Sequence, residues 1–367
     1  MAKKIRLVCT AAALVPLTAL AAACGSSSPS KPSSTKSPST SAATSGKLTE
    51  TGSTLLYPLF GTWSTAYKSS APGVSFTLGA TGSGTGIADA ASGLVNIGAS
   101  DAYLSSADMT QYPDLLNIPL TVAAVMVNYN VPGVTKPLNL NAKVLAEIYS
   151  GKITNWNNAA IAALNPGVTL PSLTIVPLHR ADGSGSTFLF TSYLAAQDPS
   201  GWSSSNIGTT ITWPTVSGAL AETGSGGMVT GCGSTKGCVA YIGISYLSKT
   251  TAAKLGEAAL ANGAGKYVQP TSAAEAAALS SFSAAPANGA QPLINTTAAA
   301  GYPIINYEYA IVKKTQPSAT DATLIKNFLN WVISTGDTST YLSSVNFQSL
   351  PSGTVTVSTN LINSITG

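Results

Sequence analysis

Residues 173–190 read LTIVPLHRADGSGSTFLF, and this stretch predicts a strand, a loop and a helix in succession. The apolar run 173–178 is typical of a buried strand, and residues 188–196 have a helical pattern. Between them lie Arg180 and a run of Asp, Gly and Ser. A strand that leads through a glycine-rich loop into a helix is the repeating unit of α/β proteins, so this stretch indicates that fold class.

Arg180 places a positive charge in this stretch. It is the only arginine after residue 6. A guanidinium is planar and permanently charged, and its donors match oxyanions. The Gly/Ser loop that follows presents backbone N–H groups and hydroxyls at the positive end of a helix, which favours the same kind of ligand. Together these features indicate an anion-binding site.

Strands alternate with helices along the rest of the chain. We expect strands at 74–78, 95–100, 122–129, 239–242 and 304–312, and helices at 86–91, 141–148 and 322–333. In open α/β sheets, ligands bind at the carboxyl ends of the strands, beside the helix N-termini. The Gly/Ser loops of this chain fall at such positions.

Two earlier loops resemble the one after Arg180. Residues 52–58 read GSTLLYP and residues 82–86 read GSGTG, and each precedes a helical pattern. One such loop is a weak signal, because glycine can serve only a turn and a hydroxyl can serve only as a helix cap. Three of them in one chain, with the arginine in one, favour an anion site.

Asp101 ends the apolar strand VNIGASD, residues 95–101. A helix cap or turn residue is the ordinary interpretation of this spacing. In an anion site, however, a carboxylate can only accept hydrogen bonds, so it can bind the O–H of hydrogen phosphate but nothing on sulfate, which has no proton at neutral pH. A buried acceptor left unpaired against sulfate is costly, and that cost would provide specificity.

The N-terminus predicts export. Residues 1–23 combine a basic start with a short apolar run and are typical of a signal peptide. Residues 20–24 read LAAAC and resemble a bacterial lipobox, although leucine stands one place further from the cysteine than usual. We therefore expect Cys24 to carry lipid (palmitate) as the first mature residue, with ordinary secretion as the alternative. Residues 24–46, rich in Ser, Thr and Pro, predict a disordered linker between this anchor and the folded part.

Charge and cysteine content exclude several classes. From Cys24 onward the chain has fifteen positive and fourteen negative side chains, a formal net charge of +1, so no nucleic-acid partner is expected. Cys232 and Cys238 are most simply a disulfide outside the cytoplasm. A metal site there would require further ligands, and His179 is the only histidine. We interpret His179 as a packing residue and expect neither metal nor cofactor.

Taken together, these segments resemble the substrate-binding proteins of phosphate-specific ABC transporters, in the periplasmic binding protein superfamily of type II topology. The resemblance runs from Thr51 to beyond Lys313. Besides the three loops and residues 98–101, it includes segments 129–133, 148–156 and 302–307. It implies a two-lobed α/β fold of the Venus-flytrap kind, with two crossover hinge strands near 119–125 and 304–309. Lobe I would comprise 47–121 plus 307–367, and lobe II would comprise 122–306.

The resemblance also implies which residues bind phosphate. They are Thr54, Leu55, Ser83, Asp101, Arg180, Ser184, Gly185 and Ser186. Leu55 stands where phenylalanine is usual and would contribute its backbone N–H, while Ser186 stands where threonine is common and keeps the hydroxyl. Asp182 would pair with Arg180 and fix its orientation rather than contact the ligand.

The function implied is high-affinity binding of inorganic phosphate outside the cell and its delivery to an ABC permease and ATPase complex for import. The protein would be a monomer, held by lipid at the outer face of the cytoplasmic membrane. An enzyme is disfavoured, because no base is placed to activate a serine and no complete nucleotide-binding loop is present. The alternative is a surface adhesin or sensor that binds phosphate on the same scaffold without transport; neighbouring permease and ATPase genes would distinguish the two.

Overall fold

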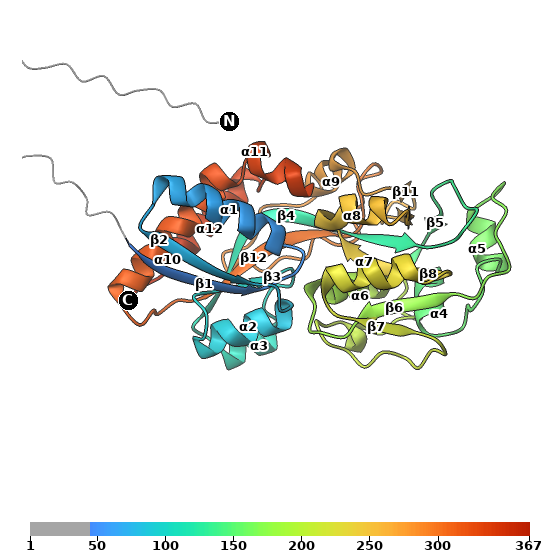
Figure 1. Ribbon diagram of the computed structural model, residues 1–367, viewed down its shortest axis with the longest axis horizontal. Coiled ribbons are helices and arrows are strands. Elements are labelled where there is room, and N and C mark those ends of the chain that lie inside the picture. The colour runs from blue at the N-terminus through green and yellow to red at the C-terminus, as the bar shows by residue number, and fades with distance from the viewer. Residues whose placement is uncertain (1–44) are drawn as a thin grey trace, which may run out of the picture. The chain divides into compact units, whose positions relative to one another are not determined.

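The computed structural model describes residues 45–367, which belong to one compact unit, Ala43–Gly367. The predicted signal peptide, Cys24 and nearly all of the predicted linker lie outside the described residues. The described chain is built on a mixed sheet of strand order β2-β1-β3-β12-β4-β8-β6-β7, with β9 (Gly256–Glu257) also paired to β4. Helices cover both faces of this sheet (Figure 1).

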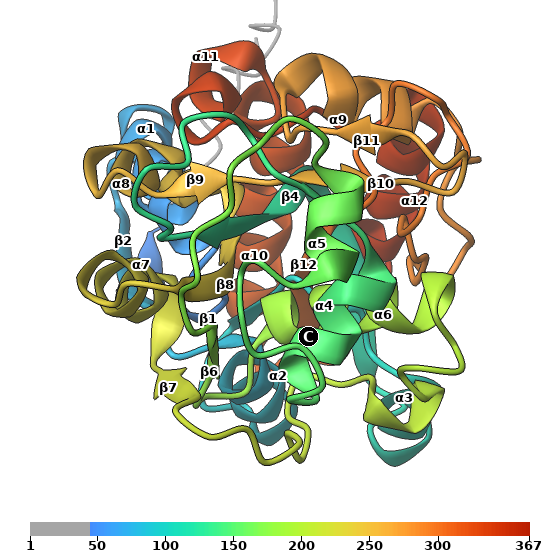
Figure 2. The ribbon, with the colours of Figure 1, turned by 90° about the vertical axis from the view of Figure 1, so that its right-hand side faces the viewer.

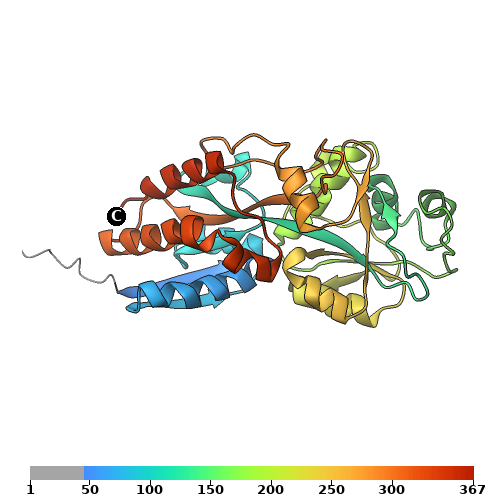
Figure 3. The same cartoon turned by 90° about the horizontal axis from the view of Figure 1, so that it is seen from above.

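The first part of the sheet carries the N-terminal and C-terminal segments of the described chain. Its strands are β1 (Gly46–Gly52), β2 (Val74–Gly79), β3 (Ile97–Ser100), β12 (Ile305–Lys313) and β4 (Leu115–Tyr129). On one face lie α1 (Tyr57–Ser70), α10 (Ala319–Trp331) and α12 (Ser352–Asn363), and Figure 3 shows these three helices in one row. On the other face lie α2 (Ser83–Ser92) and α3 (Ser106–Gln111) (Figure 1).

The second part of the sheet is formed by the middle of the chain. Its strands are the end of β4, β8 (Cys238–Gly243), β6 (Val176–Arg180) and β7 (Leu220–Glu222). Figure 2 shows α7 (Gly224–Ser234) on one side of these strands and α4 (Ala142–Tyr149) with α6 (Gly185–Gln197) on the other. The remaining elements are α5 (Ala159–Leu164), α8 (Leu247–Ala252), α9 (Ser272–Leu279), α11 (Ser339–Leu342) and a small sheet of β5 (Asn139–Leu140), β10 (Ala259–Ala261) and β11 (Tyr267–Val268).

Two antiparallel strands, β4 and β12, hold the two parts together. β12 pairs with β4 from Ile305 opposite Ala124 to Lys313 opposite Leu115. Past Ala124, residues 125–129 of β4 pair with β8 instead. Both strands are almost wholly buried, and β12 buries Asn306 and Glu308 among its apolar residues. The expected fold, two α/β lobes with two crossover strands, is confirmed; the exact lobe boundaries stay a prediction.

Most expected elements form close to the predicted positions, and two differ. β4 extends seven residues before the expected start at 122. β6 begins at Val176 rather than at 173, because Leu173 and Ile175 instead pair with the preceding segment: Trp156 N–H donates to Leu173 and Ile175 N–H donates to Thr154, both at 2.9 Å. Within residues 45–367, no helix combines the length and the apolar character needed to cross a bilayer.

The strand directions position the loops singled out above. β1, β2 and β3 run parallel to one another, and so do β6, β7 and β8. Asp101 and the loops 52–58 and 82–86 follow the carboxyl ends of the first set, and Ala181–Thr187 follows the carboxyl end of β6. The three helices that these loops precede, α1, α2 and α6, therefore begin in the region between the two parts of the sheet.

Candidate functional site

The loop after β1 is anchored to Asp101. Gly52 adopts a backbone φ of +140°, and the hydroxyl of Ser53 donates to the Asp101 carboxylate. The N–H of Leu56 in turn donates to the Ser53 hydroxyl at 3.0 Å. Leu55 has a fully buried side chain that packs against Gly243. The side chain of Leu55 thus belongs to the core, and only its backbone is left to face the site.

Thr54, in the same loop, contacts the other part of the sheet. Its hydroxyl accepts a hydrogen bond of 3.1 Å from the N–H of Ser225 and lies 2.9 Å from the Ser225 hydroxyl. Ser225 is the second residue of α7, which follows β7. The contact therefore joins two segments that are 171 positions apart in the sequence.

Ser83, the first residue of α2, also faces Asp101. Gly82 precedes it with a φ of +92°, which favours glycine. The hydroxyl of Ser83 accepts a hydrogen bond of 3.2 Å from the Asp101 N–H. Next to it, the N–H of Gly84 donates to the carbonyl of Gly183 at 3.0 Å, so this loop touches the loop after Arg180 directly.

Asp101 lies at the centre of these contacts, with only 2% of its surface exposed. Its carboxylate accepts a hydrogen bond from Ser53 and another, at 2.9 Å, from the hydroxyl of Ser186. Burial raises the pKa of the Asp101 carboxyl. Hydrogen bonds from Ser53 and Ser186 oppose that rise, and so do the neighbouring Glu308 carboxyl and the charge of Arg180.

Arg180, at the end of β6, is 5% exposed and is held at three points. Its Nε donates to Asp182 at 2.6 Å and its Nη2 donates to the other oxygen of the same carboxylate. Its backbone N–H donates to the hydroxyl of Tyr241 at 2.9 Å. Burial by itself would raise the pKa of Asp182, but the hydrogen bond and charge of Arg180 and the N–H of Gly224 bring it below its ordinary value. The guanidinium is therefore fixed in one orientation.

The loop after Arg180 leads into the first turn of α6. Ser184 is the N-cap, and its hydroxyl accepts from the Thr187 N–H at 3.3 Å. A Cβ added at Gly185 would lie 2.7 Å from the Ser83 hydroxyl and 2.6 Å from the Asp101 Cβ. Only glycine allows this approach. The first N–H groups of α6 have no partner within the helix, so this turn offers donors to an anion.

The structure thus brings the predicted residues into one cluster from both parts of the sheet. Asp101, Ser83, Gly185 and Ser186 are in direct contact, and the charge of Arg180 acts on Asp101. A cavity of about 400 Å³ lies beside this cluster; its lining includes Gly84, Ala102, Phe188 and Thr209. Among residues 45–367, no group of three or more His, Cys, Asp or Glu is arranged to hold a metal ion.

Comparison with known proteins shows which family this chain belongs to. A family model described as a PBP superfamily domain matches residues 37–335. The chain is 32% identical over 305 residues to the phosphate-binding protein PstS of Xylella fastidiosa, an alignment that covers 83% of this chain and 82% of that protein. The chain belongs to the PBP superfamily, among the PstS phosphate-binding proteins.

A second curated relative and a solved structure are also similar to this chain. The phosphate-binding protein PstS of Methanocaldococcus jannaschii is 31% identical over 377 residues, which covers 96% of this chain and 93% of that protein. The fold is similar to that of a solved high-affinity periplasmic phosphate-binding protein (PfluDING) bound with phosphate, with a TM-score of 0.69 over 88% of this chain and 99% of that one. The sequence identity in that comparison is 21%, so the likeness shows the shared fold alone.

Three residues of the cluster in this chain were not expected from the sequence. Ser53 stands beside Thr54 in the first loop, so the loop pattern itself could have indicated it. Ser225 heads α7 in the sequence GSGG, residues 224–227, which has the same Gly/Ser character as the other loops. Glu308 lies inside the strand INYEYAIVK and has no local pattern that indicates a role.

Two side chains near the cluster have packing roles. The ring of His179 stacks on Trp213 with 5.0 Å between ring centroids, and its Nδ1 lies 3.2 Å from the Arg180 carbonyl oxygen. Tyr241 stacks on Phe190 and positions Arg180 through its hydroxyl. These stacked rings therefore hold the Tyr241 hydroxyl that accepts the hydrogen bond from the Arg180 backbone.

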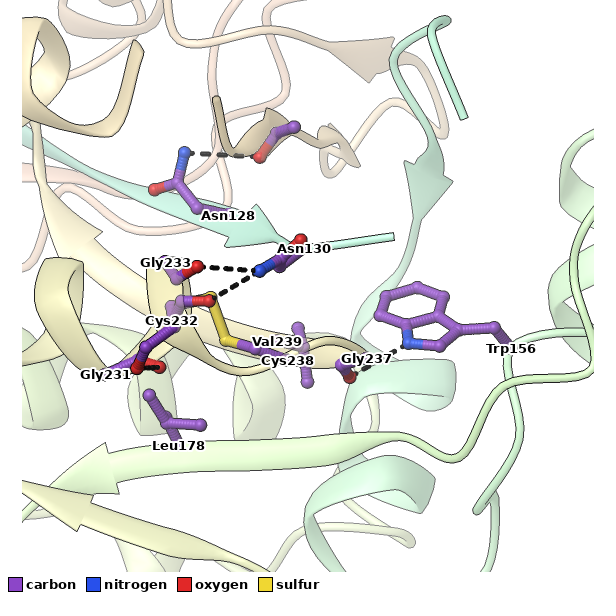
Figure 4. The surroundings of a disulfide bond; sticks show 12 residues. Asn128, Asn130, Trp156, Leu178, Gly231, Cys232, Gly233, Gly237, Cys238 and Val239 are labelled. Atoms are coloured by element: carbon purple, nitrogen blue, oxygen red, sulfur yellow. Dashed lines mark hydrogen bonds between the residues drawn. A yellow bond between two sulfur atoms is a disulfide. The ribbon is translucent and has the colours of Figure 1, made fainter. Parts of the chain in front are cut away.

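The expected disulfide is present in this family member. Cys232, in the last turn of α7, is bonded to Cys238, the first residue of β8, with a Cα–Cα distance of 5.3 Å (Figure 4). The amide of Asn130 donates to the carbonyls of Cys232 and Gly233, and the indole of Trp156 donates to the carbonyl of Gly237 (Figure 4). The bridge therefore fixes the turn that connects α7 to β8.

Proposed function

We propose that this protein binds hydrogen phosphate between its two lobes and delivers it to an ABC permease and ATPase complex. The observation that carries the proposal is the pairing of a buried carboxylate, Asp101, with a buried and oriented guanidinium, Arg180, in a cluster of hydroxyls at three helix N-termini. The curated relatives, which are named phosphate-binding proteins, support the same ligand.

Each predicted residue has a distinct task in this account. Arg180 supplies positive charge, and Asp182 holds its planar group in place. Ser83, Ser184 and Ser186 supply hydroxyls, and the backbone N–H groups of Leu55 and Gly185 supply further donors at positive helix ends. Thr54 supplies both a hydroxyl and an N–H. Asp101 accepts the proton of the ligand, so that a tetrahedral anion without a proton leaves it unpaired.

The lobe organisation follows from the sheet. We infer that lobe I comprises 47–121 plus 307–367 and lobe II comprises 122–306, so that the cluster lies between two bodies joined by β4 and β12. Contacts between the loops, such as Gly84 with Gly183 and Thr54 with Ser225, would form as the lobes close on the ligand. Closure would remove the anion from water and give a permease a defined surface to recognise.

The remaining inferences concern the location of the protein. We infer that residues 1–23 are removed, that Cys24 is lipidated, and that residues 24–46 tether a monomeric binding protein to the outer face of the cytoplasmic membrane. The Ser/Thr/Pro composition of that segment supports a tether. Release of the protein from membranes by Cys24→Ser, detected by fractionation, tests the anchor.

Calorimetry tests the ligand. The mature protein is unfolded to strip bound anion and refolded. One sample is then titrated with inorganic phosphate near pH 7.5, and a separate sample is titrated with sulfate. We expect one phosphate per chain and no heat from sulfate. The absence of any heat with phosphate would refute the proposed function, whereas equal binding of both anions would refute only the role of Asp101.

A further inference from the structure

Glu308 is a buried carboxyl that the proposed function leaves without a role. It lies in β12, one of the two strands shared by both parts of the sheet, and none of its surface is exposed. It pairs with Thr121 of β4, next to a shift in strand register between Glu308 and Tyr309. A charged group in a continuous, buried strand is costly unless it is paired, so its presence here requires a physical reason.

The face of β12 that carries Glu308 is directed at Asp101. Side chains two residues apart on a strand point to the same side, and Asn306 precedes Glu308 by two. The amide of Asn306 donates to the backbone carbonyl of Asp101 at 2.8 Å. The carboxyl of Glu308 interacts with the side-chain carboxyl of Asp101. Asn306 thus holds the backbone of Asp101, and Glu308 interacts with its side chain.

The contact between Glu308 and Asp101 requires a proton. No N–H or O–H of the described residues donates to either oxygen of Glu308. Two carboxylates are acceptors only and repel each other, so their contact becomes a hydrogen bond only when one of them is protonated.

The surroundings decide which of the two holds that proton. Asp101 has donors from Ser53 and Ser186 and the positive charge of Arg180, all of which favour its ionised form. Glu308 has none of these, and burial, followed by the neighbouring Asp101, raises its pKa well above the ordinary value. The other titratable groups nearby are Tyr309, the next residue of β12, and Asp337, which reaches the paired strand through Thr121.

We propose that Glu308 is a neutral carboxylic acid that donates its O–H to Asp101 and so keeps Asp101 an acceptor for the proton of the ligand. This inference rests on the proposed function. Without the donor, a carboxylate as buried as Asp101 would more readily hold a proton of its own. A protonated Asp101 could donate to an anion that has no proton, and the discrimination against sulfate would fall. Glu308 is thus a positioning residue for specificity.

Two substitutions separate this role from simple packing. Glu308→Gln keeps the shape and an N–H donor but cannot ionise, whereas Glu308→Leu removes the donor. By calorimetry near pH 7.5, we expect Glu308→Gln to keep the phosphate affinity within about threefold and to keep the preference for phosphate over sulfate. We expect Glu308→Leu to weaken phosphate binding by about tenfold or more and to reduce that preference, as loss of a donor to a charged group does.

The pH dependence gives a readout that a packing role would not change. Above its raised pKa, Glu308 loses its proton, adds a second negative charge beside Asp101 and weakens phosphate binding in the wild-type protein. Hydrogen phosphate keeps its own proton at moderately alkaline pH, where the comparison is made. Glu308→Gln should therefore retain its affinity at alkaline pH where the wild-type protein loses it. Glu275→Gln, at another fully buried carboxyl on α9, is the matched control and should follow the wild-type profile.

Infrared spectroscopy tests the protonation state without the ligand. The difference between wild-type protein and Glu308→Gln should show the C=O stretch of a protonated carboxyl near neutral pH, both with and without phosphate. Absence of that band would overturn the inference, and so would a Glu308→Leu protein, folded by circular dichroism, with wild-type affinity and specificity. If the wild-type protein did not bind phosphate, the proposed function would fail, while the infrared band would still report on Glu308.

Discussion

The hydroxyl of Ser186 donates a hydrogen bond of 2.9 Å to the carboxylate of Asp101, although the two residues are 85 positions apart in the sequence. Asp101 follows β3 in the first part of the sheet, and Ser186 lies in the first turn of α6 in the second part. The contact joins the residue that would select the anion to the helix that would bind it.

Arg180→Lys should weaken phosphate binding by about ten- to a hundredfold. Lysine keeps the charge, but it cannot reproduce the two-point pairing with Asp182 or present a planar fork to the anion. Calorimetry measures the change. Lys143→Arg, at an exposed ion pair on α4, is the control and should bind as the wild-type protein does. Equal affinities of Arg180→Lys and wild type would contradict the role of the guanidinium.

Ser225→Ala should increase the rate at which phosphate dissociates, by about fivefold. The substitution removes the hydroxyl contact with Thr54 between the two parts of the sheet, which is worth about 1 kcal/mol. Stopped-flow measurement of phosphate release tests this. Ser234→Ala, at the other end of α7, serves as the control. An unchanged release rate in Ser225→Ala would show that this contact does not stabilise the closed form.

The variant with both Cys232→Ala and Cys238→Ala should unfold more easily and bind phosphate normally. The bridge closes a loop with a sequence separation of only six, so its loss should cost about 2 kcal/mol, near the low end of the usual range. Chemical denaturation and calorimetry measure the two effects. Reduction of the wild-type protein should lower its stability by the same amount, and a loss of affinity in the variant would show that the turn also shapes the site.

Glu50→Gln should alter how stability depends on pH. Burial raises the pKa of Glu50 from 4.5 to about 8 in the folded protein, although the backbone N–H of Gly79 opposes part of that rise. Between these values the folded chain holds a proton that the unfolded chain releases, so this group makes the free energy of unfolding fall as pH rises. The variant should lose that part of the decline. Denaturation with urea between pH 5 and about 8.5 checks it, and identical slopes for both proteins would contradict the assignment.

The sequence predicted the local features of this fold well because they depend on neighbouring residues. The strand before Asp101 and the helix after the Arg180 loop have strong periodicity and turn signals, and both form. α7 was not predicted, because its sequence GSGGMVTGCGS is rich in glycine, a poor helix former. Burial of Met228 and Cys232 against the sheet stabilises this helix, and such tertiary contacts leave no local pattern.

In the site, too, the sequence predicts residues that stand in local motifs but not those placed by tertiary contacts. Thr54, Ser83, Asp101 and Arg180 stand in recognisable loops, so their place in a common cluster could be inferred from the order of strands and helices. Ser225 and Glu308 act across 171 and 207 positions of sequence, on Thr54 and Asp101 respectively. Glu308 approaches Asp101 because β12 lies between β3 and β4, and Ser225 approaches Thr54 because α7 begins after β7; neither arrangement leaves a local signal in the sequence.

The most direct test of this account is the Asp101→Asn variant, titrated with phosphate and with sulfate in the same calorimetric experiment near pH 7.5. Asparagine keeps the shape of the side chain but offers a donor in place of an acceptor. We expect weaker phosphate binding, measurable sulfate binding, and a phosphate-to-sulfate preference reduced by about a hundredfold or more. A preference equal to that of the wild-type protein would contradict the claim that Asp101 selects the anion.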